Sequence, residues 1–160
     1  MTEESRIPVV LLVEDDPGDV LMITEALERS GRPPVLHVAG NGHEAPDYLR
    51  RVGTHAGAVR PDLILLDLNM PRMDGREFLR RIKADPQFRA VPVVVLTTSN
   101  AEADVRGSYQ GHASAFVTKP LNLDALEDVV EQISRFYTTT SILLPLEQTP
   151  AADQSGPATA

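Results

Sequence analysis

The chain has 160 residues, and its 23 acidic residues outnumber its 15 Lys and Arg, which gives a formal net charge of −8. This length fits one domain with a buried core, and the negative charge opposes binding to nucleic acid. Because the chain has no cysteine, neither a disulfide framework nor a thiolate metal site can form. The polar N-terminus has no basic signal region, and no apolar run reaches the roughly 18 residues of a membrane span. We therefore expect a cytoplasmic protein that binds other proteins and neither nucleic acid nor membranes.

The first half of the chain alternates short apolar runs with helical patterns. After the apolar run 9–13, Val20, Ile23 and Leu27 recur at the i, i+3, i+7 spacing of one helix face. Pro46 falls past the first turn of the next helical segment, where it removes a backbone donor, so we expect a late start or a kink. The predicted elements of this half are strands at 9–13 and 35–39 and helices at 17–30 and 42–52.

The second half continues this alternation. Asp74 with Glu77 has the pattern of a capping box that opens a helix, and Ser99 with Glu102 repeats it. The run before Ser99 is nearly all β-branched, which favours a strand. The predicted elements of this half are strands at 63–67, 91–97 and 113–118 and helices that begin near Asp74, Ser99 and Asn122, the last of them ending near Phe136.

Five strands alternating with five helices predict an α/β fold with an open parallel sheet, since near-continuous apolar strands must be buried on both faces. The carboxyl ends of parallel strands meet at one edge of the sheet, where such folds bind ligands. Polar side chains lie at or just past the ends of four predicted strands, in the segments Glu14-Asp15-Asp16, Asp67, Thr97-Thr98-Ser99 and Thr118-Lys119-Pro120. This edge is therefore the predicted site.

Asp15, Asp16 and Asp67 would repel one another at this edge. At about 4 Å and an effective dielectric near 20, each pair costs on the order of 4 kcal/mol, so the group needs a compensating cation. Hard oxygen ligands without His or Cys suit Mg²⁺, and Lys119 adds one more positive charge. A carboxylate beside such a metal can act as a nucleophile that becomes an aspartyl phosphate.

Four motifs resemble the receiver domain of bacterial response regulators. They are LLVEDD at 11–16, LLDLNMPRMDG at 65–75, VVVLTTS at 93–99 and FVTKP at 116–120. The similarity covers roughly residues 7–136. It implies a flavodoxin-like (βα)5 fold with strand order 2-1-3-4-5, which takes a phosphoryl group from the histidine of a partner kinase onto Asp67.

The resemblance also implies a role for each residue around Asp67. Asp16 directly, Asp15 through water and the Asn69 carbonyl would hold Mg²⁺ with Asp67. Thr97 and Lys119 would bind the phosphoryl oxygens, and Phe116 would report the switch through its rotamer. Asn69, Thr98 and Ser99 occupy positions that tune dephosphorylation, and the Lys119–Pro120 bond is cis in the family.

Each of these residues has an ordinary structural alternative when taken singly. Asp16 precedes Pro17, so it can be a helix N-cap with proline at N1. Thr97 can be a strand end, Lys119 a surface cation and Phe116 a core side chain. Asp67 is the exception, because a carboxylate directly after four apolar strand residues is costly without water, a partner or a metal.

Two other classes of protein are weighed against a phosphoacceptor. A haloacid-dehalogenase-like phosphatase also forms an aspartyl phosphate, but its nucleophile follows the first strand, whereas Asp67 follows the third. A degenerate receiver that acts only as a docking scaffold would lack part of the phosphorylation set, which is complete here. We therefore expect a signalling protein rather than an enzyme with its own substrate, although it could catalyse its own phosphorylation and dephosphorylation.

The C-terminal part favours a receiver that stands alone. Residues 1–137 are predicted to form the domain, 138–146 an apolar extension, and 147–160 a disordered tail of low complexity. The extension either packs back on its own domain, or helps a homodimer form through the fourth helix, fifth strand and fifth helix, or docks on the kinase. This ending and the long loop before the third strand most resemble single-domain regulators associated with phytochrome-type histidine kinases.

Overall fold

The structure is a computed structural model that describes residues 6–40, 44–50, 59–70 and 73–145. Five parallel strands form one sheet in the order β2-β1-β3-β6-β7. A separate antiparallel ribbon supplies the two remaining labels, β4 and β5. Counted along the main sheet alone, the order is therefore the predicted 2-1-3-4-5. The strand bounds are β1 Val9–Val13, β2 Val35–Ala39, β3 Leu63–Leu66, β4 Asn69–Met70, β5 Met73–Asp74, β6 Val93–Thr97 and β7 Ala115–Thr118.

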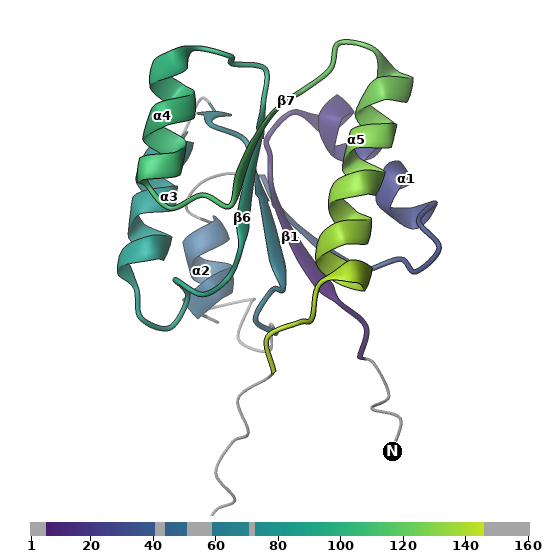
Figure 1. The fold of residues 1–160 in the computed structure, drawn as a ribbon, viewed down its shortest axis with the longest axis horizontal. Coiled ribbons are helices and arrows are strands. Elements are labelled where there is room, and N and C mark those ends of the chain that lie inside the picture. The colour runs from purple at the N-terminus through teal and green to yellow at the C-terminus, as the bar shows by residue number, and fades with distance from the viewer. Residues whose placement is uncertain (1–5, 41–43, 51–58, 71–72, 146–160) are drawn as a thin grey trace, which may run out of the picture.

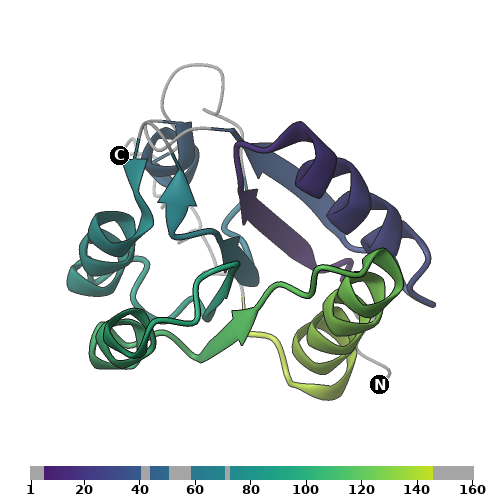
Figure 2. The same cartoon turned by 90° about the horizontal axis from the view of Figure 1, so that it is seen from above.

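Helices cover both faces of the sheet. Figures 1 and 2 show α1 and α5 together on one face and α2, α3 and α4 on the other. In the described ranges, no helix is both long enough and apolar enough to cross a bilayer. The helix bounds are α1 Pro17–Glu28, α2 Glu44–Arg50, α3 Gly75–Ala84, α4 Glu102–Gln110 and α5 Leu123–Arg135.

The three central strands supply most of the core. Every residue of β1, β3 and β6 is buried. Because side chains alternate along a strand, Leu11 and Ile64 join the cluster beneath α2 and α3, whereas Val10 and Leu63 join the one beneath α1 and α5. Burial on both faces explains why these strands read as continuous apolar runs, and the predicted parallel α/β sheet is confirmed.

One predicted helix start is wrong. Helix α4 begins at Glu102, and its N-cap is Ala101, which makes no side-chain capping bond. Ser99 lies further out, where its hydroxyl donates to Asp104 at 2.6 Å and accepts from the Ala101 N–H at 3.3 Å. The capping-box pattern therefore marks a polar turn before this helix rather than its first residue.

Pro46 lies within the second helix. It is the third described residue of α2, and α2 continues past it to Arg50. Residues 42–43 and 51–52 of the predicted helix lie outside the described residues, so its predicted ends are not tested.

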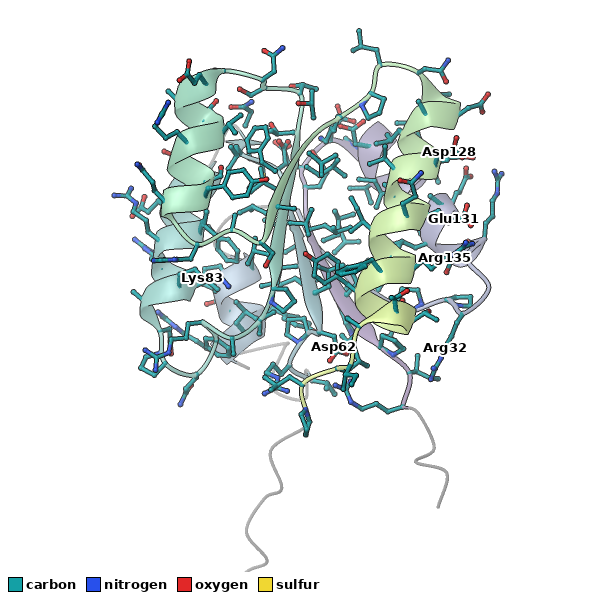
Figure 3. All side chains as sticks on the ribbon, in the orientation of Figure 1. Arg32, Asp62, Lys83, Asp128, Glu131 and Arg135 are labelled. Atoms are coloured by element: carbon teal, nitrogen blue, oxygen red, sulfur yellow. The ribbon has the colours of Figure 1, made fainter. Side chains whose placement is uncertain are left out.

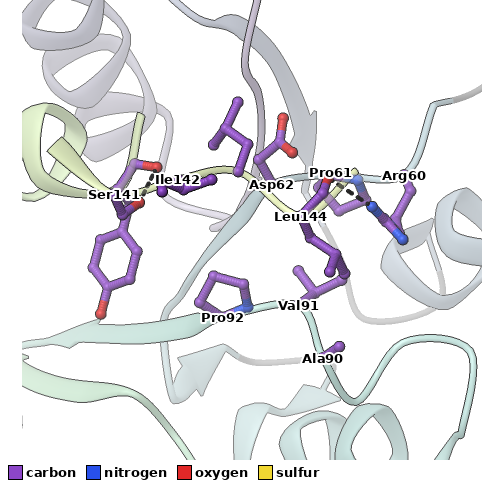
Figure 4. A pocket seen from close by; sticks show the side chains of 11 residues that line it. Arg60, Pro61, Asp62, Ala90, Val91, Pro92, Ser141, Ile142 and Leu144 are labelled. Carbon is purple, nitrogen blue, oxygen red and sulfur yellow. Dashed lines mark hydrogen bonds between the residues drawn. The ribbon is translucent and has the colours of Figure 1, made fainter. Parts of the chain in front are cut away.

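The segment after α5 packs back on its own domain. A π-helical turn at Phe136–Thr140 leads to residues whose backbone carbonyls face two arginines. Arg6 donates to the Leu144 carbonyl at 3.0 Å, and Arg60 donates to the Leu144 and Pro145 carbonyls at 3.2 and 2.9 Å. Figure 4 shows Arg60 and Leu144 in the lining of the pocket at the amino end of the sheet. The predicted tail 147–160 lies outside the described residues.

Candidate functional site

Three carboxylates meet at the carboxyl end of the sheet. They belong to Glu14 and Asp15, which follow β1, and to Asp67, which follows β3, and one oxygen from each lies within 4.8 Å of the others. The Glu14 N–H donates to the Ala39 carbonyl, so the backbone remains paired with β2 as far as Glu14. The Glu14 side chain is 1% exposed as a result, although it is an acid.

The structure does not bring Asp16 into this group. Its carboxylate caps helix α1 by accepting the N–H groups of Gly18 and Asp19 at 2.8 and 3.2 Å, and the side chain is exposed. The expectation that Asp16 binds the metal directly is therefore corrected, because the acids after β1 that converge with Asp67 are Glu14 and Asp15. Pro17 at N1 is the sequence signal for this cap.

Asp67 lies within this group of side chains, beside Glu14, Asp15 and Lys119. Its N–H donates to the Val13 carbonyl at 3.0 Å, and its side chain is 8% exposed. One carboxylate oxygen accepts the Asn69 N–H at 3.2 Å. Helix α3 starts directly behind it, because a Cβ at Gly75 would lie 2.5 Å from the Asp67 carbonyl oxygen and 2.8 Å from the Leu68 Cα. Only glycine allows this close approach.

Lys119 is the cation that pairs with these acids. Its ammonium lies 2.6 Å from Glu14 Oε2 and 2.8 Å from Asp19 Oδ2, but 3.6 Å from Asp67 Oδ2. The Lys119 N–H donates to the Thr97 carbonyl at 2.7 Å, which fixes the end of β7 beside that of β6. Sequence reasoning missed Asp19, and the only signal was an acid in the first turn of the helix that follows β1.

The acids of this group outnumber their one cation, Lys119. Burial raises the pKa of Glu14 to about 7, although its hydrogen bond with Lys119 acts in the opposite direction, and the nearby Asp67 raises it further. Burial alone would lower the pKa of Lys119, but its hydrogen bonds to Asp19 and Glu14 outweigh burial and raise it. Burial thus dominates the pKa of Glu14, whereas hydrogen bonds to two acids dominate the pKa of Lys119.

The remaining predicted residues surround this group. The Thr97 side chain is buried, and its hydroxyl oxygen accepts the Asn69 amide at 3.3 Å. Thr98 is exposed, whereas Ser99 is half-buried and bonds to Asp104. Phe116 is half-buried and packs against the core cluster beneath α3, and its N–H donates to the Tyr109 hydroxyl at 3.2 Å.

The predicted cis bond between Lys119 and Pro120 is not found. The described residues contain no cis peptide bond, so this bond is trans. The trans form is the intrinsic preference even before proline, by about 0.5 to 1 kcal/mol.

The chemistry of these side chains fits a hard divalent cation. Several carboxylates converge here around one ammonium. Carboxylate oxygens are the ligands that such ions prefer. The expectation for Mg²⁺ from the sequence thus keeps two of its carboxylates, Asp15 and Asp67, and gains Glu14. The role of the Asn69 carbonyl as a ligand stays a prediction.

The site thus combines acids, a lysine and a buried threonine at the carboxyl end of a doubly wound sheet. This combination is the one expected for a phosphoacceptor signalling domain, and comparison with known families supports that class. The family model of the response regulator receiver domain matches residues 10–131. The chain therefore belongs to the response regulator receiver family.

Similar proteins cover almost the whole described fold. Response regulator Rcp1 of Synechocystis sp. is 42% identical over 144 residues, which are 89% of this chain and 98% of Rcp1. The crystal structure of the phosphorylated cyanobacterial phytochrome response regulator RcpA is 45% identical with a TM-score of 0.83, and covers 86% of this chain and 99% of RcpA. The Mn²⁺-bound form of Rcp1 is 41% identical with a TM-score of 0.82, over the same shares of the two chains.

Proposed function

We propose that Asp67 accepts a phosphoryl group from a phosphohistidine of a partner kinase, in a reaction that requires Mg²⁺. One observation supports this most strongly: the Asp67 carboxylate lies among Glu14, Asp15 and the Lys119 ammonium. A carboxylate oxygen of Asp67 attacks phosphorus and forms the new P–O bond. The P–N bond to the histidine breaks, and the released imidazole takes a proton from water.

Each neighbour of Asp67 has a part in this proposal. Glu14, Asp15 and Asp67 would hold Mg²⁺ with the Asn69 carbonyl, and the ion would neutralise charge that develops on the phosphoryl oxygens. Lys119 and the Thr97 hydroxyl would bind those oxygens once they are on Asp67. The existence of a Mn²⁺-bound form of Rcp1 supports a divalent ion, and Mg²⁺ itself is our choice for hard oxygen ligands.

The partners in this proposal are proteins. The similarity to RcpA, a cyanobacterial phytochrome response regulator, supports a phytochrome-type histidine kinase as the phosphodonor, and we propose that the reaction takes place in the cytoplasm. The output would be a change in protein contacts, including a homodimer through α4, β7 and α5 with the C-terminal extension. In this role the chain is a phosphoacceptor and has no separate substrate.

Two other functions have less support. A haloacid-dehalogenase-like phosphatase would carry its nucleophile after β1, but the central acid, Asp67, follows β3. A docking scaffold without phosphorylation would not need the buried Lys119 ammonium beside Asp67, whose carboxylate accepts few other hydrogen bonds.

The intact mass of the protein tests the proposal. Phosphoramidate with Mg²⁺ should add the mass of one phosphoryl group to the wild type and none to Asp67→Asn. Omission of Mg²⁺ should prevent the addition. Equal labelling of the two proteins would refute Asp67 as the acceptor.

A further inference from the structure

The hydrogen bonds that the Lys119 ammonium donates go to acids other than Asp67. An ammonium has three N–H donors, and two of them serve Glu14 at 2.6 Å and Asp19 at 2.8 Å. The distance of 3.6 Å to Asp67 Oδ2 is too long for a hydrogen bond. Before phosphorylation, Lys119 is therefore held by two acids that do not receive the phosphoryl group.

Asp19 could have served its own helix instead. It is the third residue of α1, a position from which an acid often reaches back to the N-cap backbone N–H. Here the N–H of Asp16 donates to Glu14 at 3.1 Å, and the Asp19 carboxylate turns to Lys119. The contact is thus not a by-product of helix capping.

Glu14 and Asp19 differ in what it costs to release Lys119. The Glu14 side chain is 1% exposed, so water cannot replace Lys119 as the partner of its ionised carboxylate. The Asp19 side chain is 25% exposed, so water can solvate its carboxylate as soon as Lys119 leaves. Asp19 is therefore the partner that Lys119 can exchange reversibly for a new anion.

We propose that Asp19 is a positioning residue that competes with the phosphoryl group on Asp67 for the Lys119 ammonium, and so slows phosphorylation of this chain. The inference rests on the proposed function, because it assumes that Asp67 receives a phosphoryl group. It adds a residue that sets the rate of that reaction without touching the phosphoryl group.

The test uses Asp19→Asn, which keeps the shape of the side chain and removes its charge. The affinity for beryllofluoride, a phosphoryl analogue, is measured by calorimetry at saturating Mg²⁺, and the phosphorylation rate with phosphoramidate is measured by intact mass. Both should rise by about three- to five-fold, the size expected for losing one partly exposed ion pair. Asp19→Glu keeps the charge and should stay near the wild type.

A matched control separates contact from general charge. Asp124 is an exposed acid in the first turn of α5, and it is not among the acids that pair with Lys119. Asp124→Asn removes the same charge at the same end of the sheet and should change neither quantity. An equal rise in Asp124→Asn would overturn the proposal, because the effect would then come from net charge.

Two further outcomes distinguish failure of this proposal from failure of the proposed function. If Asp19→Asn binds beryllofluoride as the wild type does, or more weakly, Asp19 does not compete for Lys119 and the proposal fails while the proposed function stands. If the wild type neither binds beryllofluoride nor gains phosphoryl mass, the proposed function fails and the inference fails with it.

Discussion

Two buried acids lie at opposite ends of the same strand and have opposite surroundings. Asp62 precedes β3, and Asp67 follows it. Asp62 accepts two hydrogen bonds from the Arg6 guanidinium and one from the Val9 N–H at 2.8 Å. Asp67 accepts one backbone N–H at 3.2 Å, and its cation stays 3.6 Å away. Figure 3 labels Asp62 at the amino end of the sheet, beside the segment that follows α5.

The difference shows how one fold separates a structural acid from a reactive one. A buried carboxylate with several charge-assisted donors is satisfied and has few lone pairs left for a ligand. Asp67 keeps lone pairs free in a pocket of excess negative charge, so a metal ion and a phosphoryl group can gain binding energy there. Reactivity at Asp67 therefore depends on incomplete pairing as much as on the acid itself.

The largest expected effect is on the phosphorylation rate and comes from the loss of Lys119, with Arg6 as the comparison. Lys119→Met should slow phosphorylation by phosphoramidate about 10²- to 10³-fold, because it removes a fixed positive charge that stabilises the phosphoryl oxygens in the transition state. Arg6→Met removes the cation at the other end and should leave this rate unchanged. Mass spectrometry over time measures both, and a comparable loss in Arg6→Met would remove the distinction between the two ends.

For the stability of the protein, Asp62 should matter more than Asp67. Asp62→Asn should lower the free energy of unfolding by about 2 kcal/mol, since it breaks a partly buried ion pair with Arg6. Asp67→Asn should leave this free energy unchanged or higher, because it removes one anion from the overcharged pocket. Urea unfolding without metal provides the measurement, and a larger loss in Asp67→Asn than in Asp62→Asn would contradict the comparison.

The titration of Glu14 should make the free energy of unfolding depend on pH. Burial raises the pKa of Glu14 to about 7, so the folded protein holds this proton more tightly than the unfolded chain does. The resulting stabilisation is present below the ordinary glutamate pKa of about 4.3 and is lost as the pH rises through about 7. In the absence of metal, Glu14→Gln should therefore be more stable than the wild type by about 1 to 2 kcal/mol near pH 8.

The same experiment contains its own control. The difference between Glu14→Gln and wild type should shrink as the pH falls from about 8 toward about 4.5, where Glu14 is protonated in the folded protein and about half protonated in the unfolded chain. A constant difference across this range would show that Glu14 does not titrate as the pocket charges imply.

The smallest expected effect concerns the segment after α5. Arg60→Ala removes the hydrogen bonds to the Leu144 and Pro145 carbonyls, which are exposed. The free energy of unfolding should fall by no more than about 1 kcal/mol, and phosphorylation by phosphoramidate should not change. A clear change in the phosphorylation rate would show that this end of the sheet communicates with Asp67.

The sequence predicts the fold well because its signals there are long and redundant. The apolar runs of β1, β3 and β6 leave few alternatives, and the acid after β3 can be recognised from the cost of its burial. The motifs also bring Thr97 and Lys119 to the right edge. These features depend on strand order and on which end of each strand a residue follows, and a pattern of strands and helices is enough to give both.

The misplaced residues depend on single side-chain directions. Three consecutive acids follow β1, and periodicity does not show which of them faces the pocket, so the sequence favours Asp16 where the structure places Glu14. Ser99 misleads because a capping pattern does not distinguish a turn from the first residue of a helix. Asp19 escapes sequence reasoning because its contact with Lys119 joins residues that are 100 positions apart.

The position of the phosphoryl group is the most direct test of the central idea, that the under-paired acid after β3 is the reactive one. Borohydride reduces an aspartyl phosphate to homoserine, and peptide mass spectrometry then locates the altered residue. We predict homoserine at position 67 in protein treated with phosphoramidate and Mg²⁺, with aspartate retained at positions 15 and 62. Homoserine at any other position, with Asp67 unaltered, would contradict the account.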